Sequence, residues 1–129
     1  MTIKTVGVIG AGQMGAGIAH VSALHGYEVL VHDVARDRID AGLATIQKNL
    51  SRQVAKGVID QAGMDGALTR IRPAPELQMI GEADIAIEAA TENEEVKKSI
   101  FKALVPHLTK PETILASNTS SISITRLAS

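Results

Sequence analysis

The chain has 129 residues, with 13 basic and 14 acidic side chains, a single Tyr, a single Phe, no Trp and no Cys. The length suits one domain with a substantial core, and the balanced charge and scarce aromatic residues argue against binding to nucleic acid. No apolar run of about eighteen residues is present to cross a membrane. The lack of cysteine excludes disulfides and zinc–thiolate sites and suits a reducing cytoplasm, and we expect no metal.

Strand and helix patterns alternate along the first half of the chain. The expected elements are a strand over 3–9, a helix marked by Met14, Ile18, Val21 and Leu24, a strand over 27–33, a long amphipathic helix over 36–56 and a short helix over 60–68. Gly26 and Gly57 are natural stops just beyond the first and second helices, and Asp60 is placed to cap the third.

The alternation continues in the second half. The expected elements are an edge strand over 70–74 broken by Pro73 and Pro75, a stronger strand over 84–89, a helix capped by Thr91 or Asn93 with an inner stripe of Val96, Ile100, Leu104 and Leu108, a strand over 113–117 and a last helical pattern to Ser129. This order predicts an α/β fold with a doubly wound, mainly parallel sheet, incomplete at its last strand, and a helical hairpin inserted after the second strand. Ligands of such sheets bind at the carboxyl ends of the strands.

Residues 6–15 read VGVIGAGQMG, an apolar strand that runs directly into Gly10-x-Gly12-x-x-Gly15. In a dinucleotide-binding turn the first glycine allows a tight turn, the second lets a pyrophosphate approach the backbone, and the third lets the helix pack close to its strand. The phosphates then lie over the helix N-terminus, where free N–H groups favour negative charge. The predicted cofactor contacts at this turn are Gly10, Ala11, Gly12, Gln13, Met14 and Gly15.

Asp33 ends the second strand, twenty-one residues after Gly12. A carboxylate at this position accepts hydrogen bonds from the adenosine ribose hydroxyls and repels a 2′-phosphate, which favours NAD over NADP. Two alternatives remain from the residues alone. In the first, Asp33 only caps the next helix. In the second, Arg36 binds a 2′-phosphate and weakens the preference for NAD over NADP.

Two further motifs lie at the ends of later strands: Glu-Ala-Ala-Thr-Glu at 88–92, with Lys97 five residues on, and Ser-Asn-Thr-Ser-Ser at 117–121. With the glycine turn and Asp33, these motifs make residues 6–128 resemble the L-3-hydroxyacyl-CoA dehydrogenase family, which includes 3-hydroxybutyryl-CoA dehydrogenases. The resemblance implies that the parent protein transfers hydride between NAD and the 3-hydroxyl or 3-keto carbon of a short-chain acyl-CoA in the cytoplasm.

The resemblance also implies roles for individual residues. Ala90, Glu92 and Lys97 fall where the family contacts the nicotinamide half of the cofactor, and Ser117 falls between the nicotinamide and the reacting substrate oxygen. Asn49 and Lys56, on one face of the long helix, would lie near coenzyme A. From the residues alone, Glu92, Lys97 and Lys56 are equally well explained as solvated charges, Ser117 as a turn residue, and Glu88 as a structural carboxylate.

The family's general base is a histidine about twenty residues beyond this serine-rich motif, and a glutamate orients it. That base and its partner would lie after Ser129. We therefore interpret residues 1–129 as the N-terminal dinucleotide-binding domain of a truncated dehydrogenase. The helical domain for substrate binding and homo-oligomer formation would be absent, and turnover negligible.

Two other readings stay open. One is a stand-alone NAD(H)-binding regulatory module, and the other is a 3-hydroxyacid dehydrogenase related to 6-phosphogluconate dehydrogenase. The second group typically has Asn-Arg where this chain has Asp33-Val34.

Overall fold

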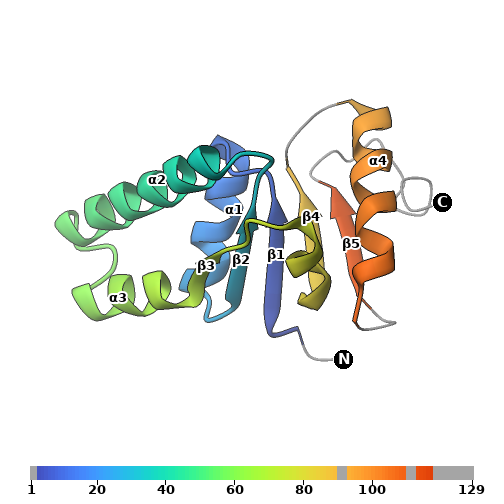
Figure 1. The fold of residues 1–129 in the computed structure, drawn as a ribbon. Helices are drawn as coiled ribbons and strands as arrows, with labels where there is room; N and C mark the ends of the chain where they lie inside the picture. Colours follow the sequence, from blue (N-terminus) through green and yellow to red (C-terminus); the bar gives the residue numbers. More distant parts are fainter. Residues whose placement is uncertain (1–2, 90–92, 110–112, 118–129) are drawn as a thin grey trace.

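The computed structural model describes residues 3–89, 93–109 and 113–117, and these form a five-stranded sheet with helices on both faces (Figure 1). The strands are β1 (Thr5–Ile9), β2 (Glu28–His32), β3 (Ile71–Pro73), β4 (Ile85–Glu88) and β5 (Ile114–Ser117). Their spatial order is β3-β2-β1-β4-β5, and every neighbouring pair is parallel. The predicted doubly wound, Rossmann-type sheet is confirmed.

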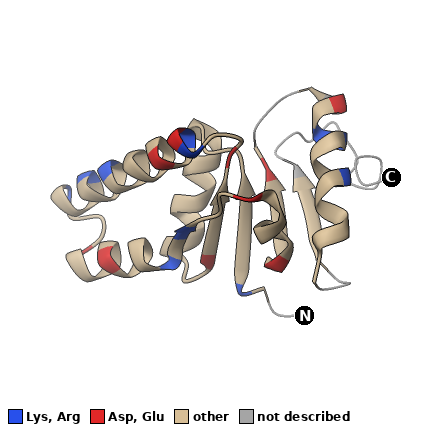
Figure 2. Cartoon of the chain, in the orientation of Figure 1, with Lys and Arg blue, Asp and Glu red and all other residues tan. Residues whose placement is uncertain are grey.

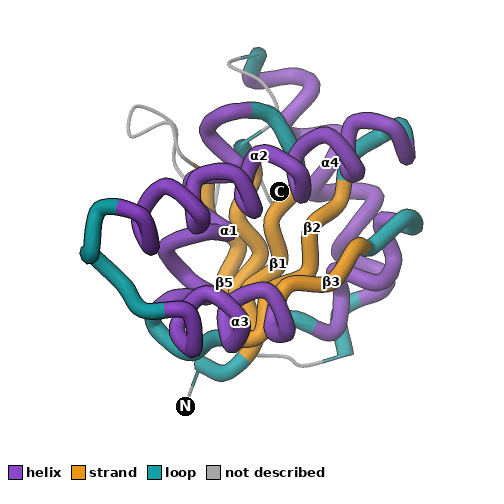
Figure 3. Tube along the Cα trace, turned by 90° about the vertical axis from the view of Figure 1, so that its left-hand side faces the viewer, coloured by secondary structure: helices purple, strands orange, loops and turns teal. Residues whose placement is uncertain are grey.

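The helices form two layers on either side of the strands (Figure 3). They are α1 (Gln13–Leu24), α2 (Arg36–Ala55), α3 (Gln61–Arg70) and α4 (Glu94–Leu104), with short 3-10 turns η1 (Leu77–Glu82) and η2 (Val105–His107). One core cluster joins α1, α2 and α3 to the sheet, and the other joins η1 and α4 to the opposite face. The expected final helix, with residues 118–129, lies outside the described residues.

Most helix ends follow the expected signals. Gly26 and Gly57 adopt positive φ angles of 93° and 74° just beyond α1 and α2. The side chain of Asp60 accepts a hydrogen bond from Gly63 N at 2.7 Å, which caps α3. Asn93 caps α4 by accepting from Val96 N at 3.1 Å, whereas Thr91 lies outside the described residues.

The helices α2 and α3 form the predicted hairpin between β2 and β3, and it extends away from the sheet (Figure 1). β3 is the edge strand that Pro73 and Pro75 predict, because it has only β2 as a neighbour in the described sheet. α2 begins beside the glycine turn, and its 20 residues carry the chain away from that turn before α3 begins.

Of the four large apolar residues that mark α1 in the sequence, only Ile18 and Leu24 pack against the core, and both are partly buried. Met14 and Val21 are 57% and 55% exposed. Small side chains such as Ala16 and Ala19 are buried instead, because the helix begins too close to β1 for larger ones. A Cβ added to Gly15 would lie 1.7 Å from Gly10 O.

The expected inner stripe of α4 is confirmed at Ile100 and Leu104 and differs at both ends. Val96 is 45% exposed, and α4 ends at Leu104, so Leu108 follows η2. The buried face is Lys97, Phe101 and Leu104, three residues spaced four and three apart. A purely apolar count misses this stripe because its first member carries a charge.

Candidate functional site

The turn after β1 gives each of its three glycines a different reason to lack a side chain. Gly10 has a φ of 109°, and its N–H donates to His32 O at 2.7 Å. Gly15 packs against Gly10 itself. A Cβ on Gly12 would meet no atom within 4 Å. Since Gly12 is also the N-cap of α1 and has no capping side chain, the helix N-terminus faces open space.

Asp33 lies directly beside this turn. Its Oδ2 accepts a hydrogen bond from Ala11 N at 2.8 Å, and its Oδ1 accepts from Val34 N at 2.7 Å. The N-cap of α2 is Ala35, without a side-chain cap, so the alternative reading of Asp33 as that helix's cap is wrong. The carboxylate belongs to the glycine turn.

Two arginines follow Asp33, and they behave differently. Arg36 donates through Nε to Asp40 Oδ1 at 3.1 Å in an exposed pair one helical turn apart. Arg38 Nη1 lies 3.8 Å from Asp33 Oδ1. The cation beside the candidate ribose-binding carboxylate is therefore Arg38, which the sequence analysis missed because it examined only the nearer arginine.

A pocket of about 340 Å³ lies between the turn and α2. It is lined by Gly10, Ala11, Gly12, Asp33, Arg38, Ala41 and Ala89. α2 approaches closely here, since a Cβ on Gly42 would lie 2.6 Å from Ala11 O. The sequence offered a signal for this contact: glycine inside a long helix costs about 1 kcal/mol relative to alanine and often marks a close approach.

A smaller apolar cavity of about 100 Å³ adjoins Asp33. Its walls are Ile9, Gly10, His32, Asp33, Val34, Leu77 and Ile100. The His32 ring is held by a 2.8 Å hydrogen bond between Nδ1 and Ala74 O. Sequence reasoning missed this cavity because its walls come from four separate segments.

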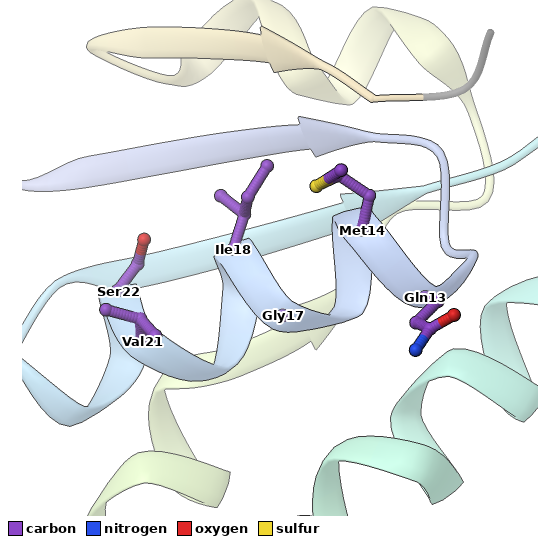
Figure 4. A pocket seen from close by; sticks show the side chains of 6 residues that line it. All are labelled: Gln13, Met14, Gly17, Ile18, Val21 and Ser22. Carbon is purple, nitrogen blue, oxygen red and sulfur yellow. The ribbon is translucent and has the colours of Figure 1, made fainter. Parts of the chain in front are cut away.

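An open groove of about 730 Å³ runs along α1, lined by Gln13, Met14, Gly17, Ile18, Val21 and Ser22 (Figure 4). Met14 and Ile18 point to the same side of the helix, and Gln13 points to the other (Figure 4). The groove is mainly apolar, so the polar chemistry lies at the glycine turn.

The carboxyl end of β4 carries a buried ion pair. Lys97 Nζ donates to Glu88 Oε1, and both side chains are fully buried. Glu88 lies on the sheet face opposite Ile85 and Ile87, as the strand alternation indicates. Lys97 is therefore not the solvated charge that its sequence position alone suggests.

The other predicted residues of the nicotinamide end are less fully described. Ser117 ends β5, where its backbone is in register with Glu88. Ala90 and Glu92 lie outside the described residues. The structure thus brings the strand ends bearing Glu88 and Ser117 together.

Asn49 and Lys56 lie away from the turn. Asn49 is half-buried, and Lys56 is exposed at the end of α2, about 20 Å along the helix from Gly42. Charged residues of both signs lie near the start of α2, and only basic ones lie further along it (Figure 2). No helix in the described ranges is long and apolar enough to span a membrane, and no group of three or more potential ligands for a metal is found there.

Comparison with known proteins identifies the family. Residues 5–129 match the model of the 3-hydroxyacyl-CoA dehydrogenase NAD-binding domain. The chain belongs to this family. Its cofactor is accordingly NAD, as Asp33 predicted.

The similar proteins are longer than this chain. It is 56% identical over 126 residues to 3-hydroxybutyryl-CoA dehydrogenase of Bradyrhizobium diazoefficiens, covering 98% of this chain and 43% of that protein. It is 40% identical over 128 residues to 3-hydroxyadipyl-CoA dehydrogenase of Escherichia coli, covering 99% of this chain and 27% of that protein.

Solved structures agree with the fold. A crystal structure of 3-hydroxybutyryl-CoA dehydrogenase from Escherichia coli superposes with a TM-score of 0.93 at 40% identity, covering all of this chain and 27% of that one. The NAD-binding domain therefore spans less than half the length of these relatives.

Proposed function

We propose that this domain holds NAD for a dehydrogenase that interconverts the 3-hydroxyl and 3-keto groups of a short-chain acyl-CoA. The observation that carries the proposal is the fixed carboxylate of Asp33 beside the open backbone of Gly12. An anionic pyrophosphate fits the free N–H groups of α1, and ribose hydroxyls fit the carboxylate.

The cavities suggest where the rest of the cofactor lies. We assign the adenine to the apolar cavity beside Val34 and Ile100, which adjoins Asp33. Gly10, Ala11, Gly12, Gln13, Met14 and Gly15 would then line the phosphates and the start of the nicotinamide half. The fit is supported by the walls that this cavity and the pocket beside Arg38 have in common, since Gly10 and Asp33 line both.

Bound NAD supplies the hydride acceptor, and the residues of this chain bind and orient it. By family resemblance we assign Ala90, Glu92 and Lys97 to the nicotinamide end and Ser117 to the substrate oxygen. The position of Ser117 at the carboxyl end of β5, next to Glu88 on β4, supports that assignment.

The acyl-CoA would extend along the α2–α3 hairpin. Lys56 is exposed and cationic, which suits the phosphates of coenzyme A, and we assign Asn49 as a second contact on the same helix. The names of the two relatives support a short acyl chain or a dicarboxylic one for those proteins. We propose the short-chain substrate for this protein, with the cytoplasm as its location.

The general base and the oligomer contacts are proposed to belong to a helical domain outside residues 1–129. In this proposal the NAD-binding domain holds the hydride carrier, and the helical domain of the parent protein supplies the general base for the substrate. The open turn and Asp33 are explained equally by a regulatory NAD(H) module, but the Ser117 motif favours the enzyme.

Titration with the reduced cofactors tests the proposal. We expect NADH to bind more tightly than NADPH, and Asp33→Ala to weaken NADH binding by about 1–3 kcal/mol, the range for a charge-assisted hydrogen bond. The measurement is NADH fluorescence, with Asp37→Ala in the first turn of α2 as a matched control that keeps wild-type affinity. Equal dissociation constants for the two cofactors would overturn the assignment of Asp33.

A further inference from the structure

His32 is a buried polar side chain to which the proposed binding of NAD has so far given no role. It is the last residue of β2, and it is 8% exposed. Side chains alternate between the two faces of a strand, so His32 lies on the same face as Leu30, which packs in the core cluster with η1 and α4. The small apolar cavity beside Asp33 is lined on this face by Leu77 of η1, Ile100 of α4 and His32. The imidazole ring therefore belongs to the cavity wall.

One hydrogen bond fixes the tautomer of the His32 ring. Nδ1 lies 2.8 Å from the carbonyl oxygen of Ala74. A carbonyl oxygen only accepts, so Nδ1 carries the hydrogen, and a neutral imidazole then presents Nε2 as an acceptor. Nε2 makes no hydrogen bond with any residue in the described ranges. Since a buried acceptor without a donor is costly, we expect a ligand of the cavity to supply that donor.

The rest of the cavity wall indicates the shape and polarity of this ligand. Gly10 N already donates to His32 O at 2.7 Å, and Val34 N already donates to Asp33 Oδ1 at 2.7 Å. Apart from His32 and Asp33, the side chains at the wall are apolar. The side chain of Val34 is 85% exposed, so a ligand in the cavity gains apolar contact there. The cavity suits a flat, largely apolar ring with a hydrogen-bond donor at its edge.

We propose that His32 selects the adenine base of NAD by accepting a hydrogen bond from its 6-amino group. In NAD the adenine is joined to ribose through N9, so N1, N3 and N7 are acceptors and the 6-amino group is the donor of the base. An acceptor at the cavity wall can therefore bind adenine only through that group. Asp33, the proposed ribose contact, is the next residue, so the end of β2 contacts both base and sugar. This inference rests on the proposed placement of adenine in the cavity.

A change of base alone tests this role. The reduced nicotinamide hypoxanthine dinucleotide differs from NADH only in its base, where a carbonyl oxygen replaces the 6-amino group and N1 carries a hydrogen. The readout is the ratio of the dissociation constants for the two dinucleotides, measured by fluorescence titration. His32→Asn removes the Nε2 acceptor, and its amide keeps a donor for Ala74 O. His20→Asn is the matched control, because His20 is also 8% exposed but bonds to Gln53 on α2.

We expect wild-type protein to bind NADH about tenfold more tightly than the hypoxanthine dinucleotide, because one buried hydrogen bond is left unmade. In His32→Asn the ratio should fall to within about twofold of one, mainly through weaker NADH binding, and in His20→Asn it should stay at the wild-type value. A wild-type ratio of one overturns the role of His32, as does a preference that persists in His32→Asn or is lost in His20→Asn as well.

These outcomes are distinct from failure of the proposed NAD site. Binding of NADH without discrimination between the bases leaves that site standing and refutes only the role of His32. Failure of wild-type protein to bind either dinucleotide refutes the proposed NAD site and this inference with it.

A measurement on wild-type protein decides if His32→Asn does not fold. The nitrogen chemical shift of an unprotonated imidazole nitrogen moves toward that of a protonated one when it accepts a hydrogen bond. We expect NADH to move the signal of His32 Nε2 in this direction, and the hypoxanthine dinucleotide to leave it near its position in the free protein. Equal shifts with both dinucleotides contradict the proposal.

Discussion

At Gly12 the backbone is held in a conformation that alanine can also adopt, with φ −72° and ψ −168°. Gly12→Ala should therefore leave the fold intact and place a methyl group in the path proposed for the pyrophosphate, since nothing of the protein lies within 4 Å of it. We expect unchanged stability to urea and NADH binding weakened by about 2 kcal/mol or more, the cost of leaving charge-assisted hydrogen bonds unmade.

Gly17→Ala is the control for this substitution. A Cβ there is equally free of contacts, but it lies one turn further along α1. NADH binding should stay at the wild-type level, and stability should rise by about 0.5–1 kcal/mol because alanine is the better helix former. If Gly12→Ala binds NADH as tightly as Gly17→Ala does, the phosphates do not pass over this turn.

Arg38 is the second residue whose role a pair of variants resolves. With Asp33 replaced by serine, the guanidinium 3.8 Å away loses its carboxylate neighbour and becomes available to a 2′-phosphate. We expect Asp33→Ser to shift the affinity ratio toward NADPH, and Arg38→Gln in the same background to remove that shift. Fluorescence titration of both cofactors measures the ratios. A shift that survives Arg38→Gln would assign the 2′-phosphate contact elsewhere, with Arg36 as the next variant.

The sequence predicts roles for Asp33 and the glycines because those proposed roles depend on local spacing. Arg38, Val34 and Ile100 escaped it for a different reason. Each becomes part of the site only when separate segments meet at one sheet edge. Lys97 was found through family resemblance, but its burial could not be foreseen, since it depends on Glu88 from another element.

Among the elements, α2 packs closely against the glycine turn at Gly42. Gly42→Ala would place a Cβ 2.6 Å from Ala11 O, so α2 must shift. We expect a loss of about 1–3 kcal/mol of unfolding free energy in urea, the usual cost of overpacking, together with weaker NADH binding.

Gly66→Ala on α3 is the matched substitution with room. Its nearest neighbours are atoms of the flexible Arg70 side chain at 3.5 Å or more. It should stabilise the protein by about 0.5–1 kcal/mol. A stabilising Gly42→Ala would show that α2 does not press on the turn.

The elements themselves were predictable from periodicity and end signals, and the parallel, doubly wound sheet followed from their alternation. The buried faces of the helices were less predictable. The count of large apolar residues placed Ile18, Leu24, Ile100 and Leu104 against the core correctly, but it missed the buried alanines of α1 and the buried Lys97 of α4 and included the exposed Met14, Val21 and Val96. A helix that packs close to a sheet has room only for small side chains. A buried charge needs a partner, and here the partner lies on another element, which the pattern of one helix cannot show.

For the whole molecule, cofactor binding should raise the free energy of unfolding. A ligand that binds only the folded state at one hundred times its dissociation constant adds about 2.7 kcal/mol to the unfolding free energy. We expect NADH to do so in urea unfolding, and NADPH at the same concentration to add less. Equal stabilisation by both would contradict the preference assigned to Asp33.

Catalysis by residues 1–129 alone should be absent. A general base must lie within hydrogen-bonding reach of the substrate proton. His20 is bonded to Gln53, His32 to Ala74 O and His25 to Val21 O, and His107 lies in η2. We expect no measurable NADH oxidation with acetoacetyl-CoA. Robust turnover would place the base within this chain.

One helix connects the two halves of the proposed chemistry. α2 packs against the glycine turn at Gly42, and Lys56 follows its last turn. If the proposed ligands occupy both ends, their affinities are thermodynamically linked. Whatever factor coenzyme A imposes on NADH binding, NADH must impose on coenzyme A. The binding of cofactor and the binding of substrate would thus be linked through α2, without direct contact between the two ligands.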